Sequence, residues 1–495
     1  MDKEDTYYRA MLARDYRFDG KFFVGVKTTG IYCRPICPAK PKRENVEFFP
    51  TSHLAEKSGY RPCLRCRPEA APQSPAWSGK SALVQRVLKS ISDQEYADLD
   101  ETAFAERFGI SSRHLRRLFE EEIGKSPKRL RFENRLNFAR KLIVETAIPM
   151  GEIAFSSGFS SVRRFNDAIK DRFHRPPSLL RRGMRTRRLR PSPRDQERGL
   201  TLSLPYRPPF DWEASLAYYR LHGIAGLETF TDGVYERVFR GDGDPGIIQV
   251  TQGRGPAALD LRVIGAETQA LGRLVRNVRR MFDLDSDPLL VANAFAGSAR
   301  LGRLYRKRPG LRAPRGWDAY ETAVCSILGQ LVSIGQANRM IARLVRAYGE
   351  PIRHPLTGAE IHLFPPPEAL ADSDLESVGT TRARRATLRE FCGKLSRGEI
   401  SLHGTQDPER FRESLLAIKG IGPWTAEYIG LRCIADTDAF PATDLVLRRA
   451  MEADPDLDLD RVRPWRGYAA AYLWNEHANR FAGKKKPAAG KEKRK

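Results

Sequence analysis

The sequence predicts a multidomain protein that is mainly α-helical, with smaller α+β parts. A chain of 495 residues is long enough for three or four domains that each bury their own core. Two stretches rich in proline, serine and charge, at 67–81 and 184–199, are typical of solvated linkers. The expected domains are 1–75, 81–183, 200–300 and 312–482, followed by a basic tail at 483–495 with too little apolar content to fold.

The charge of the chain favours a polyanionic partner. Lys and Arg outnumber Asp and Glu by 85 to 61, which gives a formal net charge of +24. Nucleic acid is the leading partner, and an anionic membrane surface is the weaker one. No run of about 18 apolar residues occurs, and the charged N-terminus lacks the apolar core of a signal peptide. We therefore expect a soluble, cytoplasmic protein with no membrane partner.

Four of the seven cysteines are clustered near the N-terminus, as Cys33-x3-Cys37 and Cys63-x2-Cys66. In a reducing compartment, clustered cysteines are more often metal ligands or nucleophiles than disulfides. These spacings fit four thiolate ligands of one tetrahedral zinc, and a small domain gains stability from such a metal. The spacing leaves open whether the zinc is purely structural or whether one thiolate reacts.

Residues 81–183 are predicted to be helical and contain an internal repeat. Ala105-x3-Gly109-Ile110-Ser111 recurs 49 residues later as Ala154-x3-Gly158-Phe159-Ser160. In each copy the Ala can pack, the Gly supplies a turn and the Ser can cap the next helix, which is typical of a helix-turn-helix. An ordinary helical bundle with a basic surface is the alternative. The helices that follow carry side chains suited to phosphates and base edges, namely Arg113, His114, Arg116, Arg163 and Arg164, and an inward face of Leu115, Leu118, Phe119, Phe165 and Ile169.

Residues 200–300 alternate between strand-like and helical runs. Strands are predicted for TLSLPY, YERVFR, GIIQVTQ and ALDLRVIG, and helices for ASLAYYRLH and ETQALGRLVRNVRRMF. We expect an α+β unit with a small antiparallel sheet, followed by an all-α region with short loops.

The C-terminal region contains Leu415-Leu-Ala-Ile-Lys-Gly-Ile-Gly-Pro-Trp-Thr-Ala426, and Asp444 follows eighteen residues after Ala426. Gly420 and Gly422 allow a tight turn and expose backbone N–H groups to a DNA phosphate. In this frame, which includes Thr425, the glycines predict a helix-hairpin-helix that holds one strand of DNA. Asp444 precedes Leu-Val-Leu-Arg-Arg, so the pattern alone makes it a helix N-cap or a catalytic carboxylate.

The N-terminal motif resembles the zinc domain of the Ada family. The resemblance rests on Phe23-Val-Gly-Val-Lys-Thr-Thr-Gly-Ile-Tyr-Cys-Arg-Pro-Ile-Cys37, Arg43-Glu-Asn-Val-Glu-Phe48 and Gly59-Tyr-Arg-Pro-Cys-Leu-Arg-Cys66. It implies one Zn²⁺ per chain on Cys33, Cys37, Cys63 and Cys66, and transfer of a methyl group from a DNA methyl phosphotriester to Cys33. Four thiolates overload the dication with negative charge, so that one sulfur stays nucleophilic. Methylation removes one negative charge and should tighten DNA binding.

The repeat at 81–183, with its closing Phe173-His-Arg-Pro-Pro-Ser, resembles the AraC-type DNA-binding domain. This resemblance implies two recognition helices in successive major-groove segments, so that one chain can grip promoter DNA without dimerising. We therefore expect a monomer that binds double-stranded DNA and acts on RNA polymerase as a transcriptional regulator.

From Pro208-Pro-Phe-Asp-Trp212 through Ile327-Leu-Gly-Gln-Leu-Val-Ser333 to Trp474, the chain resembles helix-hairpin-helix DNA glycosylases, most closely the AlkA type that acts on 3-methyladenine. The resemblance makes Asp444 the carboxylate that stabilises positive charge on the deoxyribose as the base leaves. An alkylated purine is already cationic, and aromatic rings can hold it by stacking and cation–π attraction. The matching positions are Trp424, Tyr428, Trp474 and Tyr218 for the pocket, and Leu331 for the wedge that fills the gap left by the flipped base. Without the resemblance, each aromatic residue would be assigned to the core or to an interface, and the alternative for Leu331 is a buried helix leucine.

Missing motifs refine this expectation. Relatives that also cut the DNA strand carry a lysine where this chain has Trp424, so we expect a monofunctional enzyme that leaves an abasic site. No iron–sulfur cysteine motif follows Cys433, and the Pro-Cys-His-Arg motif of the Ada O6-methylguanine methyltransferase domain is missing. The chain is thus similar to an Ada–AlkA fusion of the bacterial nucleoid. The rival interpretation is a DNA-binding regulator with a structural zinc and a catalytically inactive glycosylase fold.

Overall fold

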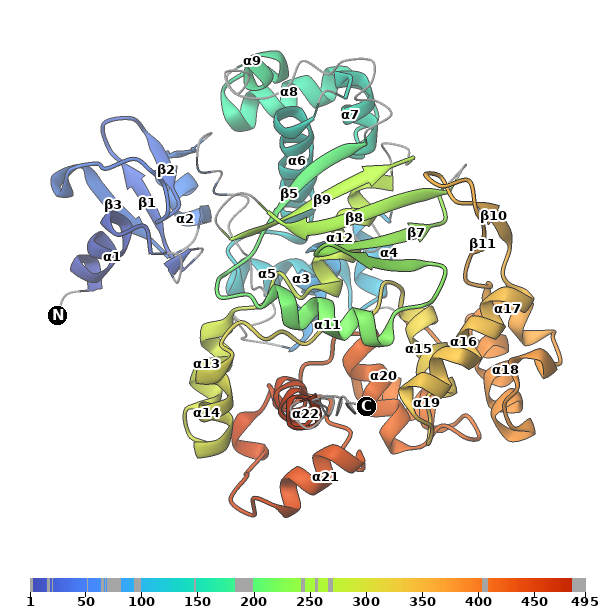
Figure 1. Cartoon of the computed structure of the whole chain (residues 1–495). Coiled ribbons are helices and arrows are strands. Elements are labelled where there is room, and N and C mark those ends of the chain that lie inside the picture. The colour runs from blue at the N-terminus through green and yellow to red at the C-terminus, as the bar shows by residue number, and fades with distance from the viewer. Residues whose placement is uncertain are drawn as a thin grey trace, which may run out of the picture.

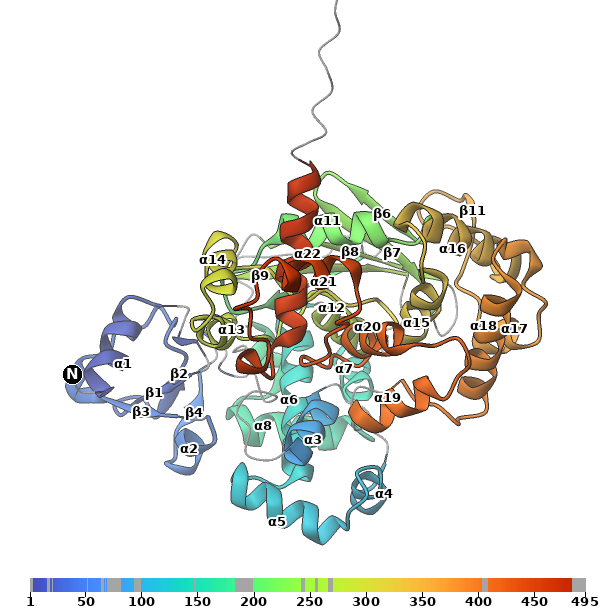
Figure 2. The same cartoon turned by 90° about the horizontal axis from the view of Figure 1, so that it is seen from below.

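The computed structural model describes residues 3–15, 18–19, 21–50, 52–63, 66, 68, 82–92, 99–146, 148–182, 199–241, 245–253, 257–265, 270–402 and 408–482. The predicted linkers lie outside these residues except for Pro68 and Gly199, and the predicted basic tail lies wholly outside them. Within the described ranges, no helix is long and apolar enough to cross a membrane. In both views the N-terminal unit lies on one side of the molecule and α16–α19 lie on the opposite side (Figures 1 and 2).

The N-terminal unit is a four-stranded sheet in the order β3-β1-β2-β4. Its elements are α1 (Lys3–Leu12), β1 (Phe23–Val26), β2 (Ile31–Cys33), η2 (Arg43–Asn45), β3 (Val46–Phe49), α2 (Ser52–Lys57) and β4 (Arg61–Pro62). Side-chain alternation along β1 builds two small cores, because Val24 packs with α1 residues and Phe23 packs with Tyr32 and Ala55. β2 pairs with β1 in antiparallel and with β4 in parallel orientation, which places the end of β2 beside the end of β4.

The second unit contains two helix-turn-helix motifs joined by a long helix. Its helices are α3 (Ala82–Ser92), α4 (Glu101–Glu106), α5 (Ser112–Glu122), α6 (Pro127–Glu145), α7 (Met150–Ser156), α8 (Val162–Phe173) and α9 (Pro177–Arg182). The turns between α4 and α5 and between α7 and α8 use Gly109 and Gly158 at φ of +72° and +76°, where a side chain would be strained. Ser111 caps α5 as predicted, but Ser161 rather than Ser160 caps α8. The second turn is one residue longer than the repeat suggests.

The inward faces predicted for α5 and α8 are confirmed. Leu115, Phe119, Phe165 and Ile169 are buried, and Leu118 is half-buried.

The α+β unit is a five-stranded antiparallel sheet in the order β5-β9-β8-β7-β6. Its elements are β5 (Leu200–Pro205), α11 (Trp212–His222), β6 (Glu228–Thr231), β7 (Val234–Phe239), β8 (Gly246–Gln252), β9 (Ala258–Ile264) and α12 (Leu271–Met281). The predicted sheet is confirmed, with β6 as a strand that the sequence did not suggest. One continuous hydrophobic core includes residues of α6, β5, α11 and α12, so the helix-turn-helix unit packs directly on the sheet.

The C-terminal half is helical, as predicted, except for a small hairpin of β10 (Pro351–Arg353) and β11 (Glu360–His362). The remaining elements are α13 (Pro288–Phe295), α14 (Ala299–Lys307), α15 (Ala319–Leu328), α16 (Ile334–Tyr348), α17 (Pro367–Ala371), η6 (Glu376–Val378), α18 (Arg382–Ser396), α19 (Pro408–Leu416), α20 (Pro423–Cys433), α21 (Leu445–Glu452), η7 (Asp460–Val462) and α22 (Arg466–Ala482). One core joins α15, α16, α18 and α20 to the far face of the sheet, and another joins α13 and α14 to α21 and α22.

Candidate functional site

The four clustered cysteines come together at the ends of β2 and β4. Cys33 is the last residue of β2, and the backbone N–H of Cys63, just after β4, donates to the carbonyl of Tyr32 at 3.0 Å. The four Sγ atoms of Cys33, Cys37, Cys63 and Cys66 all lie within 4.8 Å of one another. Sulfur atoms at about 2.3 Å from a tetrahedral zinc are separated by less than this, so the donor set and its compactness fit a structural-type zinc site.

Burial and electrostatics differ among the four thiols. Cys33 is only 6% exposed, whereas Cys63 is half-buried and is the most accessible of the four. Interaction with Cys37 raises the pKa of Cys33, and interaction with Cys33 lowers the pKa of Cys63. When thiols lie this close together, ionisation of one disfavours ionisation of its neighbours. A cation bound to all of them neutralises this repulsion.

Arg34 connects the cysteine cluster to the buried Asp19. Its backbone N–H donates to Cys66 Sγ at 3.3 Å, and its guanidinium binds both carboxylate oxygens of the buried Asp19. The main-chain carbonyl of Asp19 in turn accepts a hydrogen bond of 3.0 Å from Arg207, which pairs with Asp287. The cysteine loop is therefore tied to the segment between β5 and α11. Nothing in the sequence pattern marked these residues.

Glu56, on α2, connects the cysteine unit to both helix-turn-helix motifs. Its carboxylate accepts a hydrogen bond of 2.7 Å from the Tyr32 hydroxyl, pairs with Arg172 of α8, and lies 3.6 Å from the Lys125 ammonium, which follows α5. Burial alone would raise the pKa of Glu56, but Arg172 and Lys125 lower it below its usual value. Tyr32, which precedes Cys33, is thus linked through the Glu56 carboxylate to the ends of α5 and α8, the two predicted recognition helices.

The predicted DNA-contacting side chains of these helices lie largely in solvent. Arg113, Arg116, Arg163 and Arg164 are exposed, and His114 is half-buried. Arg116 forms an ion pair of 2.9 Å with Glu120 one turn along α5, a contact that an exposed side chain can give up at little cost.

The predicted hairpin forms the turn between α19 and α20. Gly420 has a φ of +93°, and a Cβ atom there would lie 2.1 Å from Thr387 Oγ1, so only glycine fits. Gly422 is the N-cap of α20 and is surrounded by open space, which leaves its backbone approachable. Thr425 is only 3% exposed and accepts a hydrogen bond of 2.8 Å from Gln330, so in the free protein it binds the hairpin to the next loop rather than facing solvent.

Leu331 projects from that loop, between α15 and α16. It has a φ of +54° and is fully exposed, and it is therefore not a buried helix leucine. The neighbouring Gln330 donates to the carbonyl of Gly420 at 3.1 Å and accepts from Arg384 at 2.5 Å. These hydrogen bonds connect the loop that carries Leu331 to the hairpin, so the two lie side by side on the surface.

Asp444 is both an N-cap and part of the aromatic cluster. Its Oδ1 accepts the backbone N–H groups of Val446 and Leu447 at 3.0 and 3.2 Å and the indole N–H of Trp474 at 3.0 Å. Its Oδ2 accepts the indole N–H of Trp424 at 3.1 Å. The predicted N-cap is therefore observed, and it leaves Oδ2 to Trp424, so the cap does not use the whole carboxylate.

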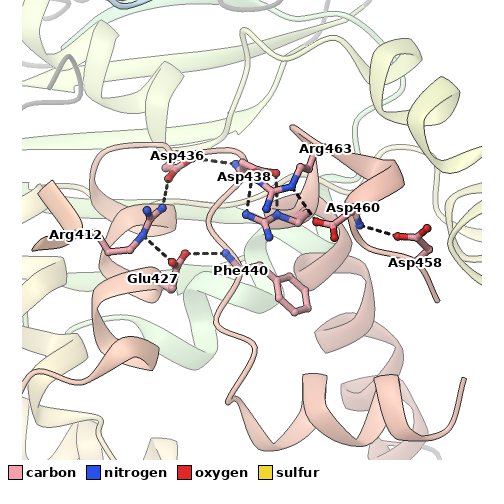
Figure 3. A network of polar contacts seen from close by, with 9 residues as sticks. Arg412, Glu427, Asp436, Asp438, Phe440, Asp458, Asp460 and Arg463 are labelled. Carbon is pink, nitrogen blue, oxygen red and sulfur yellow. Dashed lines mark hydrogen bonds and ion pairs between the residues drawn. The ribbon is translucent and has the colours of Figure 1, made fainter. Parts of the chain in front are cut away.

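Polar contacts fix the loop that carries Asp444 from α20 to α21 (Figure 3). Arg412 pairs with Glu427 at 2.6 Å and with Asp436 at 3.2 Å, and Glu427 accepts the backbone N–H of Phe440 at 3.0 Å. These contacts join α19, α20 and the loop, which leads on to Asp444. They could not be predicted from the sequence because the partners become neighbours only in the folded chain.

The four predicted aromatic residues converge, but Tyr218 differs from the others. Trp424 and Tyr428 stack with ring centres 5.1 Å apart, and Tyr428 meets Trp474 edge-on at 5.9 Å. Tyr218, on α11, instead stacks on His222 at 4.3 Å. Burial lowers the pKa of His222 to about 4, so this imidazole is neutral at physiological pH.

A residue that the sequence interpretation missed lies among these rings. The guanidinium of Arg432 contacts Tyr218, Tyr428 and Trp474. The sequence contained a signal that places Arg432 with the aromatic residues, because Trp424, Tyr428 and Arg432 recur every four residues and so share one face of α20.

Comparisons with known proteins match separate parts of the chain. Residues 6–69 match the model of the metal binding domain of Ada, residues 104–183 a helix-turn-helix domain, and residues 201–318 the AlkA N-terminal domain. The probable bifunctional transcriptional activator/DNA repair enzyme AlkA of Mycobacterium tuberculosis is 37% identical over 96% of both chains.

Two proteins of Escherichia coli match separate parts. DNA-3-methyladenine glycosylase 2 is 29% identical over 55% of this chain and 96% of its own length. The bifunctional transcriptional activator/DNA repair enzyme Ada is 37% identical over 25% of this chain and 34% of its own length.

Proposed function

The chain belongs to the family of Ada–AlkA fusions, bifunctional transcriptional activators and DNA repair enzymes with a glycosylase part, and on that premise we propose how each part acts. The protein binds double-stranded DNA, and its cofactor is zinc. We propose that it accepts methyl groups from DNA methyl phosphotriesters, regulates promoters, and hydrolyses the N-glycosidic bond of alkylated bases such as 3-methyladenine. The proposed domains keep the boundaries predicted above.

The glycosylase proposal rests on one observation, the carboxylate of Asp444 held between two tryptophan N–H groups. In the proposed reaction the bond from C1′ to the base breaks, its electron pair leaves with the base, and positive charge develops on the deoxyribose. Asp444 stabilises that charge until water adds to C1′ and releases its proton to solvent. Trp424, Tyr428 and Trp474 supply the electron-rich rings for the extruded base, Tyr218 lies behind them, and Leu331 fills the gap in the duplex.

Release of 3-methyladenine from methylated DNA tests this assignment. We expect Asp444→Asn to lower the rate on the order of a thousand-fold, since a unit charge about 4 Å away at an effective dielectric of about 20 contributes about 4 kcal/mol. Asp318→Asn is the matched control, because Asp318 caps α15 through two backbone N–H groups and contacts neither tryptophan. Equal release by wild type and Asp444→Asn would contradict the assignment of Asp444, whereas no release by the wild type would favour the catalytically inactive regulator.

In the proposed methyl transfer, the Cys33 sulfur attacks the methyl carbon of a phosphotriester. An S–C bond forms, the C–O bond breaks, and its electron pair stays on the phosphate oxygen, which restores the diester and consumes the protein in one turnover. Zinc, when bound to Cys33, Cys37, Cys63 and Cys66, keeps the thiols deprotonated near neutral pH. Because Cys63 is more exposed than Cys33, identifying the methylated cysteine decides the assignment.

Glu56 supports a route from methylation to promoter binding. Tyr32 adjoins Cys33 and donates to Glu56, which pairs with Arg172 and approaches Lys125. Loss of one negative charge at the cysteine cluster would reduce the repulsion between DNA phosphates and the N-terminal unit. Glu56 connects this unit to both helix-turn-helix motifs, so DNA bound by the motifs would be held more tightly. DNA affinity of the full chain before and after stoichiometric methylation measures this effect, and an unchanged affinity would refute it.

We propose that α5 and α8 enter the major groove, with Arg113, His114, Arg116, Arg163 and Arg164 as the contacting side chains. Gly420 and Gly422 would hold a phosphate of the damaged strand, and Thr425 would support that turn from within. Two motifs in one chain allow a monomer to bind, and RNA polymerase is the proposed partner at promoters. Footprinting together with sedimentation of the complex tests both the site length and the monomeric state.

A further inference from the structure

A buried cation lies among the aromatic side chains of the glycosylase site. Arg432 is only 4% exposed, and its guanidinium carbon lies 4.8 Å from the ring centre of Tyr218, 5.3 Å from that of Tyr428 and 5.2 Å from that of Trp474. One terminal nitrogen donates to the carbonyl of Pro314, whereas Nε has no hydrogen-bond partner among the described residues. In the part of the chain that the structure describes, no carboxylate forms an ion pair with this guanidinium.

This environment is unfavourable for a residue that serves packing alone. A guanidinium removed from water without a carboxylate partner is strongly destabilised, and contacts with aromatic rings offset only part of that penalty. Buried charges of this kind concentrate at functional sites. Trp474 connects the charge to the chemistry, because the same indole that contacts Arg432 donates to Asp444 at 3.0 Å. The positive charge thus lies one aromatic ring behind the proposed catalytic carboxylate.

We infer that Arg432 is a specificity-determining residue that favours the release of uncharged damaged purines. This inference rests on the glycosylase function proposed above. When the bond between C1′ and the base breaks, the electron pair moves onto the base. A cationic alkylated base becomes neutral, whereas an uncharged base becomes an anion that then takes a proton from water. A fixed positive charge behind the aromatic rings stabilises the second kind of leaving group and has no comparable effect on the first.

The effect should appear in the second-order rate constant for base release. Arg432 repels a cationic base when it enters the site, which weakens binding. The same repulsion is relieved as the base becomes neutral, which speeds bond breaking. The second-order rate constant compares free DNA with the transition state, so the two effects cancel in it. An uncharged base enters without penalty and gains attraction as negative charge develops. For an anion roughly 8 Å from the guanidinium at an effective dielectric of about 20, Coulomb attraction corresponds to a rate effect of roughly thirty-fold.

The test compares two oligonucleotide duplexes, one with a single hypoxanthine and one with a single 7-methylguanine, in single-turnover assays below saturation. The variants are Arg432→Met, which removes the charge, and Arg432→Lys, which keeps it. Arg432→Gln is a second neutral variant that can still donate to the Pro314 carbonyl if Arg432→Met fails to fold. We expect a neutral variant to lose roughly thirty-fold on hypoxanthine and less than about three-fold on 7-methylguanine, and Arg432→Lys to keep the wild-type ratio of the two rates.

The ratio of the two rates separates specificity from a structural role. Equal losses on both duplexes would show that Arg432 only supports the fold, and would overturn the inference. A wild-type enzyme that releases 7-methylguanine but not hypoxanthine would also overturn it while leaving the proposed function intact. Release of neither base by a wild-type protein that releases 3-methyladenine would overturn the inference alone, and failure to release 3-methyladenine as well would refute the proposed glycosylase function and the inference with it.

Discussion

The two tryptophans bonded to Asp444 should contribute unequally to base excision. Oδ1 of Asp444 accepts from Val446, Leu447 and Trp474, whereas within the described ranges Oδ2 accepts only from Trp424. Replacing Trp474 by Phe leaves two backbone donors on Oδ1, so the carboxylate keeps its orientation. Replacing Trp424 by Phe leaves Oδ2 without a protein donor, and the carboxylate plane can then rotate away from the deoxyribose.

The size of the difference follows from the hydrogen bonds. A hydrogen bond to a charged group contributes about 1.5–3 kcal/mol. If that contribution is expressed in the transition state, Trp424→Phe should slow base release roughly ten- to a hundred-fold, while Trp474→Phe should slow it by less than about five-fold. Phenylalanine keeps an aromatic ring in each place, so stacking on Tyr428 and the contact with Arg432 change little.

Single-turnover release of 3-methyladenine at saturating enzyme is the appropriate assay, because it isolates the chemical step from DNA binding. Thermal unfolding of both variants checks that the fold is retained. If Trp474→Phe were slowed as much as Trp424→Phe, or if neither were slowed more than two-fold, the carboxylate would not be oriented by these indoles and the explanation would be wrong.

Three further changes test other parts of the molecule. Cys33→Ala should abolish methyl uptake from a methyl phosphotriester, with peptide mass spectrometry as the readout, and a methyl group found on the more exposed Cys63 of the wild type would contradict the assignment. Glu56→Gln should lower the free energy of unfolding by about 3 kcal/mol, because it removes the carboxylate that pairs with the buried Arg172 and leaves Lys125 with Glu133 alone, whereas Glu47→Gln, which removes the exposed pair with Lys27, should change it by less than about 0.5 kcal/mol. The Glu56 contribution should be present at neutral pH and lost on acidification, since the pKa of this carboxyl is lowered in the folded state. Leu331→Ala should leave stability within about 0.5 kcal/mol, because the side chain is fully exposed, yet slow excision about ten-fold; an unchanged excision rate would exclude a wedge.

The elements that the sequence predicted well depend on neighbours close in the chain. Strands β8 and β9, the buried faces of α5 and α8, and the turn at Gly420 follow from side-chain period or from a backbone angle that only glycine accepts. The cap of α8 was misplaced by one residue because the second turn is longer, and the repeat contains no mark of that extra residue.

By itself, the sequence determined the residue types and spacings that carry the chemistry: four clustered cysteines, the repeated helix-turn-helix, and a glycine hairpin followed by Asp444. The tertiary structure decided which groups meet. Asp444 and Trp474 are 30 residues apart, Arg432 and Tyr218 come from different units, and Glu56 reaches Arg172 across 116 residues. Such contacts depend on how separate cores pack, and no local period encodes that packing. Only the folded chain therefore shows that the carboxylate that caps α21 also binds two indoles, and that a buried guanidinium contacts the aromatic rings beside it.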